Sequence, residues 1–209
     1  MKNNKNTIKI FAINVAISFF FASIFITILY FVGEEKINYY SALINSLIVN
    51  TDKESEAVFD VEAKRLIEYP TYGKKFGVIK IPSIDLSLPL YHGDSLKILH
   101  YGIGHYAGSY FPGEGGSIIL PGHNNVGVFH NLDKVKVGDK VIIEANYGTF
   151  TYEVTSYKVV KETDLDAFPI EKEEELLVMY TCYPINRSVI GRKTERYVVY
   201  AKKIGESYE

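Results

Sequence analysis

The sequence has few of the residues that build metal and disulfide sites. It contains one cysteine, five histidines and no tryptophan. A single cysteine has no disulfide partner within its own chain, and this His/Cys content cannot form a Cys-rich zinc site. The H-E-x-x-H pattern of zinc proteases is absent as well. We therefore expect neither a metal nor a cofactor, and the lone thiol becomes a candidate for chemistry of its own.

The chain also lacks an excess of charge of either sign. Its formal net charge is −2, and no basic block follows the lysines near its start. Nucleic-acid-binding domains usually carry a basic patch, so this balance argues against nucleic acid as a partner. With 47% hydrophobic residues and 17 tyrosines, the composition is that of a globular protein that can bury a core without disulfides.

Charge is missing altogether from residues 10–32. As a helix, this run would exceed the bilayer hydrocarbon core of about 30 Å. Lysines precede it and Glu34 and Glu35 follow it, which favours a cytoplasmic N-terminus and an extracellular remainder. A cleaved signal peptide is the alternative, but its apolar region would be shorter and would end in small residues. We expect a single-pass cell-membrane protein with a cytoplasmic tip at residues 1–9 and a transmembrane signal anchor at residues 10–32.

Residues 33–75 are rich in charge and have a mixed pattern, so we expect an extracellular stalk that is partly helical. Within it, Ser55 to Ile67 contains good helix formers with apolar residues among them, which predicts a helix. Proline and glycine in the segment Tyr69 to Gly73 would end that helix. The stalk could also pack on the domain that follows.

A β-rich domain is predicted for residues 76–209. Short apolar or alternating runs between turn residues indicate strands. The predicted strands are Gly77–Ile81, Leu86–Tyr91, Ser117–Leu120, Lys140–Glu144, Thr149–Lys161, Leu176–Thr181 and Arg196–Ile204. Short helices are expected near Leu96–His100 and Val128–Leu132, and Tyr147-Gly148 is a predicted hairpin tip. Because the order has no βαβ rhythm, we expect an all-β barrel or sandwich.

The lone cysteine, Cys182, comes just after the apolar run Leu176–Met179 and is followed closely by Pro184, which cannot continue a central strand. The thiol is therefore predicted to lie at a strand end, where loops open around rigid positions. Two interpretations stand at this point. The cysteine is either a reactive nucleophile or a small buried hydrophobe, since unpaired cysteine is often buried.

A thiol nucleophile needs an acid–base partner, and histidine is the usual one. His123 is the best candidate, because it follows the predicted strand Ser117–Leu120 on a loop that contains glycine. His92, His100 and His105 lie in connections, where a surface or hydrogen-bonded structural histidine is the ordinary expectation.

Acyl transfer also needs a hydrogen-bond donor for the oxyanion. Arg196 opens the last predicted strand, and if this strand pairs with that of Cys182, the guanidinium would lie beside the thiol. A surface arginine on an edge strand is the alternative. Arg187 and Arg192 lie in the preceding loop and are less constrained.

The order Gly122-His123, Thr181-Cys182, Arg196 resembles a known family, the sortases, which are membrane-anchored cysteine transpeptidases of Gram-positive-type cell surfaces. The resemblance spans about residues 76–204, and Gly104-His105-Tyr106 is similar to the sequence of class D members. It implies a closed eight-stranded β-barrel with a few short helices. It also implies that His123, Cys182 and Arg196 are the catalytic residues.

Two residues depart from the family pattern. One is Tyr180, which precedes Thr181 where some sortases have a smaller side chain. Many sortases carry arginine or lysine after the Gly-His pair, where this chain has Asn124. We expect this difference to alter the rim of the cleft.

The resemblance further implies a ping-pong acyl transfer. Cys182 would attack the threonine carbonyl of a Leu-Pro-x-Thr-Gly-like (LPXTG) sorting signal and cleave it between threonine and glycine. Arg196 would steady the oxyanion, and His123 would protonate the leaving amine. An amino group of a cell-wall peptidoglycan precursor would then resolve the thioacyl intermediate.

Several alternatives remain open. Pilus-type sortases use a pilin lysine as the acceptor and usually carry an Asp-Pro-aromatic lid before the barrel. No such motif occurs here, because Pro70 follows Tyr69, so wall anchoring is favoured. The acidic run Glu171–Glu175 is either a solvated loop or a calcium site. L,D-transpeptidase-like and papain-like enzymes fit the motif order poorly. A non-catalytic, membrane-anchored wall-binding β-domain would leave Cys182 buried and inert.

Overall fold

The computed structural model describes residues 13–28, 54–125, 127–170, 174–185 and 192–208. The chain separates into two compact units, Met1–Tyr40 and Ser41–Glu209. In the first unit, residues 13–28 form a helix with exposed side chains. No helix within these described ranges is long and apolar enough to cross a membrane. The ends of the predicted anchor, residues 10–12 and 29–32, lie outside the described residues.

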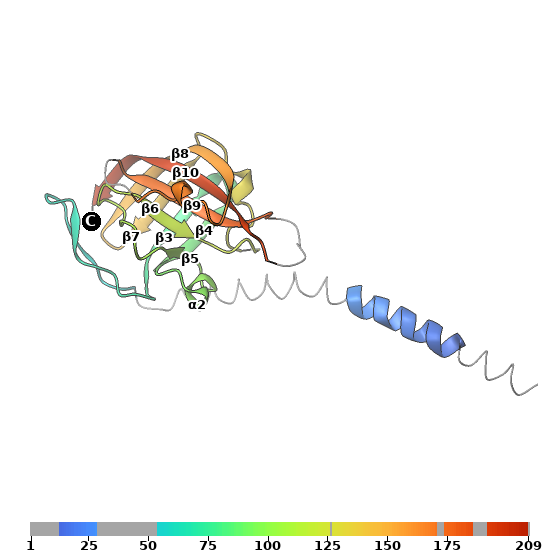
Figure 1. Cartoon of the computed structure of the whole chain (residues 1–209). Helices are drawn as coiled ribbons and strands as arrows, with labels where there is room; N and C mark the ends of the chain where they lie inside the picture. Colours follow the sequence, from blue (N-terminus) through green and yellow to red (C-terminus); the bar gives the residue numbers. More distant parts are fainter. Residues whose placement is uncertain (1–12, 29–53, 126, 171–173, 186–191, 209) are drawn as a thin grey trace, which may run out of the picture. The chain divides into compact units, whose positions relative to one another are not determined.

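The second unit is built on one eight-stranded sheet that curls into a nearly closed barrel (Figure 1). Its strand order is β5-β4-β3-β7-β8-β10-β9-β6. The bounds are β3 Lys75–Ile81, β4 Leu86–His92, β5 Ile103–His105, β6 Ile118–Pro121, β7 Lys140–Ala145, β8 Gly148–Lys161, β9 Leu176–Tyr183 and β10 Glu195–Tyr208. At the seam, the Tyr106 N–H donates to the Ile119 carbonyl at 2.9 Å. The prediction of an all-β barrel is confirmed.

The predicted strands all occur, with small shifts at their ends, and one strand of the barrel was missed. The missed strand, β5, has three residues with a central glycine, too short to show an alternating pattern. The β7–β8 hairpin closes at the pair Ala145↔Gly148, so its tip is Asn146-Tyr147. The helical segments are α2 Leu96–Leu99 and the 3-10 turns η1 Pro82–Ile84, η2 Leu132–Lys134 and η3 Leu165–Ala167.

The side chains of the barrel strands alternate between two apolar clusters. Residues such as Leu177, Met179 and Val199 belong to the large cluster inside the barrel. Intervening strand positions form a smaller cluster on the outer face, composed of Ile119, Val160, Val178 and Val198 together with Ala167 of η3. The η3 segment covers this outer cluster, because the Tyr200 hydroxyl donates to the Ala167 carbonyl at 2.8 Å. The period of two thus gives one region of the sheet two apolar faces.

The helix predicted for Ser55–Ile67 is wrong. This segment forms an antiparallel hairpin of β1 (Val58–Asp60) and β2 (Arg65–Glu68). The Phe59 ring stacks on Tyr147 at 5.3 Å and on Tyr208 at 5.1 Å between centroids, and Leu66 is buried in the barrel core cluster. Packing against the barrel therefore outweighs the local helix propensity of the segment.

Candidate active site

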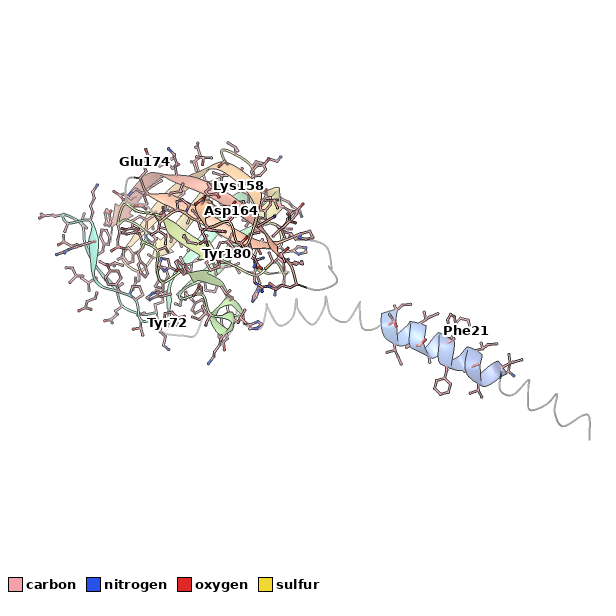
Figure 2. All side chains as sticks on the ribbon, in the orientation of Figure 1. Phe21, Tyr72, Lys158, Asp164, Glu174 and Tyr180 are labelled. Atoms are coloured by element: carbon pink, nitrogen blue, oxygen red, sulfur yellow. The ribbon has the colours of Figure 1, made fainter. Side chains whose placement is uncertain are left out.

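Cys182 lies near the end of β9, as predicted. It is half-buried, and its thiol is not in a disulfide. Strand β9 runs between β6, its parallel neighbour, and β10, its antiparallel neighbour. Val178 of β9 belongs to the outer apolar cluster and the half-buried Tyr180 packs against it, and Figure 2 shows Tyr180 in this wall of the barrel. By the same alternation Cys182 faces outward, at the end of that apolar surface.

Arg196 lies directly across from Cys182. The two residues are register partners in the β9–β10 ladder, so the predicted pairing of these strands is confirmed. Residues opposite each other in an antiparallel pair share a face, with Cβ atoms about 4.5–5.5 Å apart. The structure therefore brings the guanidinium-bearing residue and the thiol-bearing residue together on the outer face.

Three hydrogen bonds within the described residues hold the Arg196 guanidinium. Its Nη1 donates to the carbonyls of Lys193 at 3.0 Å and Glu195 at 2.9 Å, and its Nη2 donates to Glu162 Oε2 at 2.6 Å. A guanidinium has five N–H groups, so these bonds within the described residues leave Nε–H and one Nη2–H for a ligand. Arg192 binds the same carboxylate oxygen at 2.8 Å, but its side chain is 78% exposed against 16% for Arg196.

The loop that carries His123 starts beside the residues that precede Cys182. Strand β6 ends at Pro121, and the next residue, Gly122, donates its N–H to the Tyr180 carbonyl at 3.0 Å. The buried Thr181 hydroxyl returns a bond to the Gly122 carbonyl at 2.8 Å. The parallel β6–β9 pairing thus extends past the strand end, and it brings the histidine loop to the thiol.

A second tie lies on the other side of the histidine. The Asn124 side-chain Nδ2 donates to the carbonyl of Cys182 at 3.0 Å and contacts that of Pro184 at 3.4 Å. Residues 122 and 124 are therefore both bound to the β9 end, and His123 lies between them. This contact could not be found from the sequence, because an amide side chain fits many surface roles.

The imidazole of His123 is partly buried, and its Nε2 is buried with no hydrogen-bond partner among the described residues. Burial lowers the pKa of His123 below its usual value, and the neighbouring His100, whose ring lies 5.5 Å away, lowers that pKa further. The lowered pKa favours the neutral ring at pH 7, and Nε2, which has no hydrogen bond within the described residues, can take up and return a proton. The contact with His100 could not be predicted from the sequence.

The histidines at the start and end of the β4–β5 crossover have structural partners, as predicted. His92 Nδ1 pairs with the Pro70 carbonyl at 2.6 Å, so it carries the proton. His105 is fully buried, and its Nε2 pairs with the Tyr110 carbonyl at 2.9 Å. Burial lowers the pKa of His105 to about 4. Both rings are therefore held by backbone carbonyls, as expected for structural histidines.

No cluster of metal-ligating side chains occurs in the described parts of the chain. Of the acidic run, residues 171–173 lie outside those parts. Lys202 binds Glu174 at 2.8 Å, and Lys203 binds Glu175 at 2.9 Å. The two described carboxylates of the run are therefore already neutralised by lysines.

A mixed β-barrel with an outward-facing, half-buried thiol at one strand end and a neutral imidazole on the adjoining loop has the architecture of a β-barrel cysteine enzyme. The sortase domain family model matches residues 79–204. The chain is 36% identical over 135 residues to Sortase D of Bacillus subtilis. The matched region covers 65% of this chain and 67% of that protein. The chain therefore belongs to the sortase family and is a cysteine transpeptidase.

Solved structures agree with this assignment. The Sortase D5 transpeptidase of Clostridium perfringens is 32% identical, with a TM-score of 0.57 over 65% of this chain and 82% of that one. A sortase C of Clostridium perfringens, solved with the C-terminal cell wall sorting motif, is 30% identical, with a TM-score of 0.56 over 65% of this chain and 73% of that one.

Proposed function

We propose that this sortase is a membrane-anchored enzyme of class D type that cleaves an LPXTG-like sorting signal between threonine and glycine. It holds the protein as a thioacyl intermediate on Cys182 and transfers it to an amino group of a cell-wall precursor. The observation that carries the proposal is the β9–β10 register, in which Arg196 is the partner of Cys182. His123, on the loop bound to the same strand end, completes the proposed catalytic set.

In this mechanism His123 transfers protons, and Arg196 stabilises the negative charge of the oxyanion. The Cys182 sulfur attacks the threonine carbonyl as the imidazole takes up the thiol proton. The uncommitted Nε–H and Nη2–H of Arg196 donate to the oxyanion, and the imidazolium then protonates the departing glycine amine. In the second half-reaction the acceptor amine gives a proton to His123 and displaces the thiolate, and the imidazolium then returns this proton to the thiolate. The lowered pKa of His123 favours a neutral thiol–imidazole resting pair.

The outer face beside the thiol supports a peptide substrate of this kind. Val178 of β9 and Val198 of β10 are buried members of the outer apolar cluster, and Tyr180 of β9 packs against that cluster, on the face where Cys182 and Arg196 lie. Because Tyr180 is only half-buried, its ring can contact an apolar substrate residue that precedes the threonine. The sortase C relative solved with a sorting motif supports the same substrate class.

Membrane anchoring and orientation rest on the sequence. Residues 10–32 carry no charge and follow a lysine-rich tip, which supports a span with a cytoplasmic N-terminus and an extracellular catalytic domain. Protease treatment of intact cells expressing the chain with a C-terminal tag tests this proposal. The tag should be digested in intact cells, and a protected tag would contradict the orientation.

The substrate is tested by incubating the protein with a Leu-Pro-x-Thr-Gly peptide library and identifying the trapped thioester by mass spectrometry. The expected adduct lies on Cys182, and a Cys182→Ala variant serves as the control that should form none. Wild-type turnover by that variant would contradict the thioacyl mechanism. If Cys182 neither forms an adduct nor reacts with thiol reagents, the alternative of a non-catalytic wall-binding domain is favoured.

The acceptor is tested by competition. Two amines are offered together, a glycine- or diaminopimelate-containing wall peptide and a lysine-containing pilin peptide, and the two conjugates are quantified. We expect the wall-type product to dominate. The pilus-type alternative, supported by the similarity to a sortase C, predicts the lysine isopeptide instead, and this result would leave the Cys182 mechanism unchanged.

A further inference from the structure

The side-chain amide of Asn124 connects two segments that carry opposite halves of the proposed acid–base pair. Asn124 follows His123 directly in the chain, and its side-chain Nδ2 donates to the carbonyl of Cys182 at 3.0 Å. The same nitrogen contacts the carbonyl of Pro184 at 3.4 Å. One neutral donor thus contacts the backbone on both sides of Tyr183, directly after the thiol-bearing residue.

The position of these contacts distinguishes Asn124 from the other ties between the two segments. Gly122 and Thr181 bind across the segments before His123 and Cys182. After these two residues, the hydrogen bonds that join the histidine loop to the end of β9 within the described chain come from Asn124. Lys193, from the loop before β10, binds the Pro184 carbonyl through its Nζ at 2.7 Å. The Cys182 carbonyl itself is held from the histidine loop by Asn124.

Holding this carbonyl controls the direction of the thiol. The peptide plane after Cys182 sets the backbone dihedral at that residue, and the Cα–Cβ bond follows the backbone. A misplacement of about 1 Å between reacting groups can lower a rate about 100-fold. His123 Nε2 has no hydrogen-bond partner in the described residues, so the position of the ring depends more strongly on the loop backbone.

We propose that Asn124 is a positioning residue, which keeps the Cys182 thiol and the His123 imidazole within reach for proton transfer. The inference rests on the proposed function for the roles of these two residues. Asn124 does not touch the substrate in this proposal. It acts through the carbonyl of Cys182, by donating a hydrogen bond without adding a charge beside the imidazole.

The first test compares Asn124→Ala with Asn146→Ala in the full chain. Asn146 is a matched control, because its Nδ2 also donates to a backbone carbonyl, that of Ser55 at 2.5 Å, but it does so far along the chain from the thiol. We expect Asn124→Ala to lower kcat for a Leu-Pro-x-Thr-Gly peptide about 10- to 100-fold, with KM changed less than about threefold. Asn146→Ala should keep kcat within about twofold of wild type, although both variants lose stability.

A second variant, Asn124→Asp, has the same shape but reverses the hydrogen-bond role. Its carboxylate would face two carbonyl oxygens, and only the protonated acid could donate. Its activity relative to wild type should therefore be lowest at neutral pH and should rise as the pH falls toward the carboxyl pKa of about 4. A purely structural role would produce no such rise in the ratio.

The rate of Cys182 alkylation by iodoacetamide, measured across pH, needs no sorting signal. It therefore tests positioning even if the substrate assignment is wrong. The wild-type profile should show an inflection that depends on His123, and Asn124→Ala should alter it. An unchanged alkylation profile together with an unchanged kcat would overturn the role of Asn124. So would a loss of kcat no larger than that of Asn146→Ala. Absence of a wild-type thioester with an altered alkylation profile would instead overturn the proposed substrate.

Discussion

Buried polar groups near the two ends of strand β6 differ in their hydrogen bonding. Before β6, the turn Phe111–Gly115 is held by two buried carboxylates whose oxygens all have donors. After β6, the partly buried His123 presents a ring nitrogen that has no partner within the described residues. Buried polar groups are normally satisfied, so an unsatisfied one calls for a reason. At the His123 end the reason we propose is chemistry.

The satisfied end is built on Glu114 and Glu175. Glu114 Oε1 accepts from the Leu66 N–H at 3.2 Å and the Tyr69 hydroxyl at 3.0 Å, while Oε2 accepts from the Phe111 N–H at 2.9 Å. These bonds attach the β1–β2 hairpin to the turn before β6. Saturation of this kind is typical of carboxylates that hold structure together.

Glu175 performs the same task from the start of β9. Its Oε1 accepts from the Gly113 N–H at 3.1 Å and the Tyr152 hydroxyl at 2.7 Å, and its Oε2 from the Gly115 N–H at 3.2 Å. Gly113 has a φ of +94°, and a Cβ there would lie 2.8 Å from the Phe150 ring. The turn thus needs glycine for its shape and a carboxylate for its amides.

The largest effect is expected at the unsatisfied end. Replacing His123 by alanine should lower the rate of sorting-signal cleavage about 1,000-fold, because the proton acceptor and donor is lost. His92→Ala is the matched control, since the His92 ring pairs with the Pro70 carbonyl. It should change stability but leave kcat within about twofold. Equal losses of activity in the two variants would show that the unpaired ring nitrogen of His123 has no special role in the reaction.

Arg196→Ala should follow, with a loss of about 100- to 1,000-fold in kcat if its guanidinium binds the oxyanion. Arg192→Ala is the control, because Arg192 binds the same Glu162 oxygen from an exposed position. We expect little change in that variant. A loss of kcat that occurs only in Arg192→Ala would mean that the oxyanion donor is Arg192, in the loop before β10.

Much of the fold could be predicted from the sequence, because the strands carry local patterns. The seven predicted strands occur because alternating or continuous apolar runs persist over four or more residues. The hairpin formed by residues 58–68 could not be found in this way. Its conformation is set by Tyr147 and Tyr208, which stack on Phe59 and are far away along the chain.

The candidate site shows the same division. The strand-end positions of His123 and Cys182 and the pairing of Arg196 followed from strand order and short motifs. The contacts of Asn124, Glu162 and His100 did not, because each depends on a side chain that reaches across loops. Loop geometry sets such contacts, and residue type alone does not predict it.

His105 sharpens the comparison, because its buried Nδ1 also has no partner in the described residues. Unlike His123, it is fully enclosed. Its pKa is about 4 in the folded protein, against about 6.5 in an unfolded chain. Below pH 6.5 the unfolded chain therefore binds a proton that the folded protein rejects, and stability should fall by about 3 kcal/mol between pH 6.5 and pH 4.

Denaturant unfolding across this pH range measures that loss. In His105→Phe the free energy of unfolding should depend less steeply on pH, whatever its absolute value, because the titrating group is gone. The other histidines contribute equally to both proteins. An identical pH slope in wild type and variant would show that His105 is protonated in the folded state.

The smallest effect is expected when the satisfied end is weakened. Glu114→Gln leaves one acceptor oxygen for the donors of Leu66, Tyr69 and Phe111, so about 1–3 kcal/mol of stability should be lost. Hydrogen exchange at the Leu66 amide should become faster, because that N–H loses its carboxylate. Glu62→Gln, in the exposed hairpin turn, should change neither property. Sorting-signal cleavage should stay near the wild-type rate, because Glu114 lies before β6 and the thiol is held at the far end. A large loss of kcat with an unchanged Leu66 exchange rate would mean that the two ends are coupled.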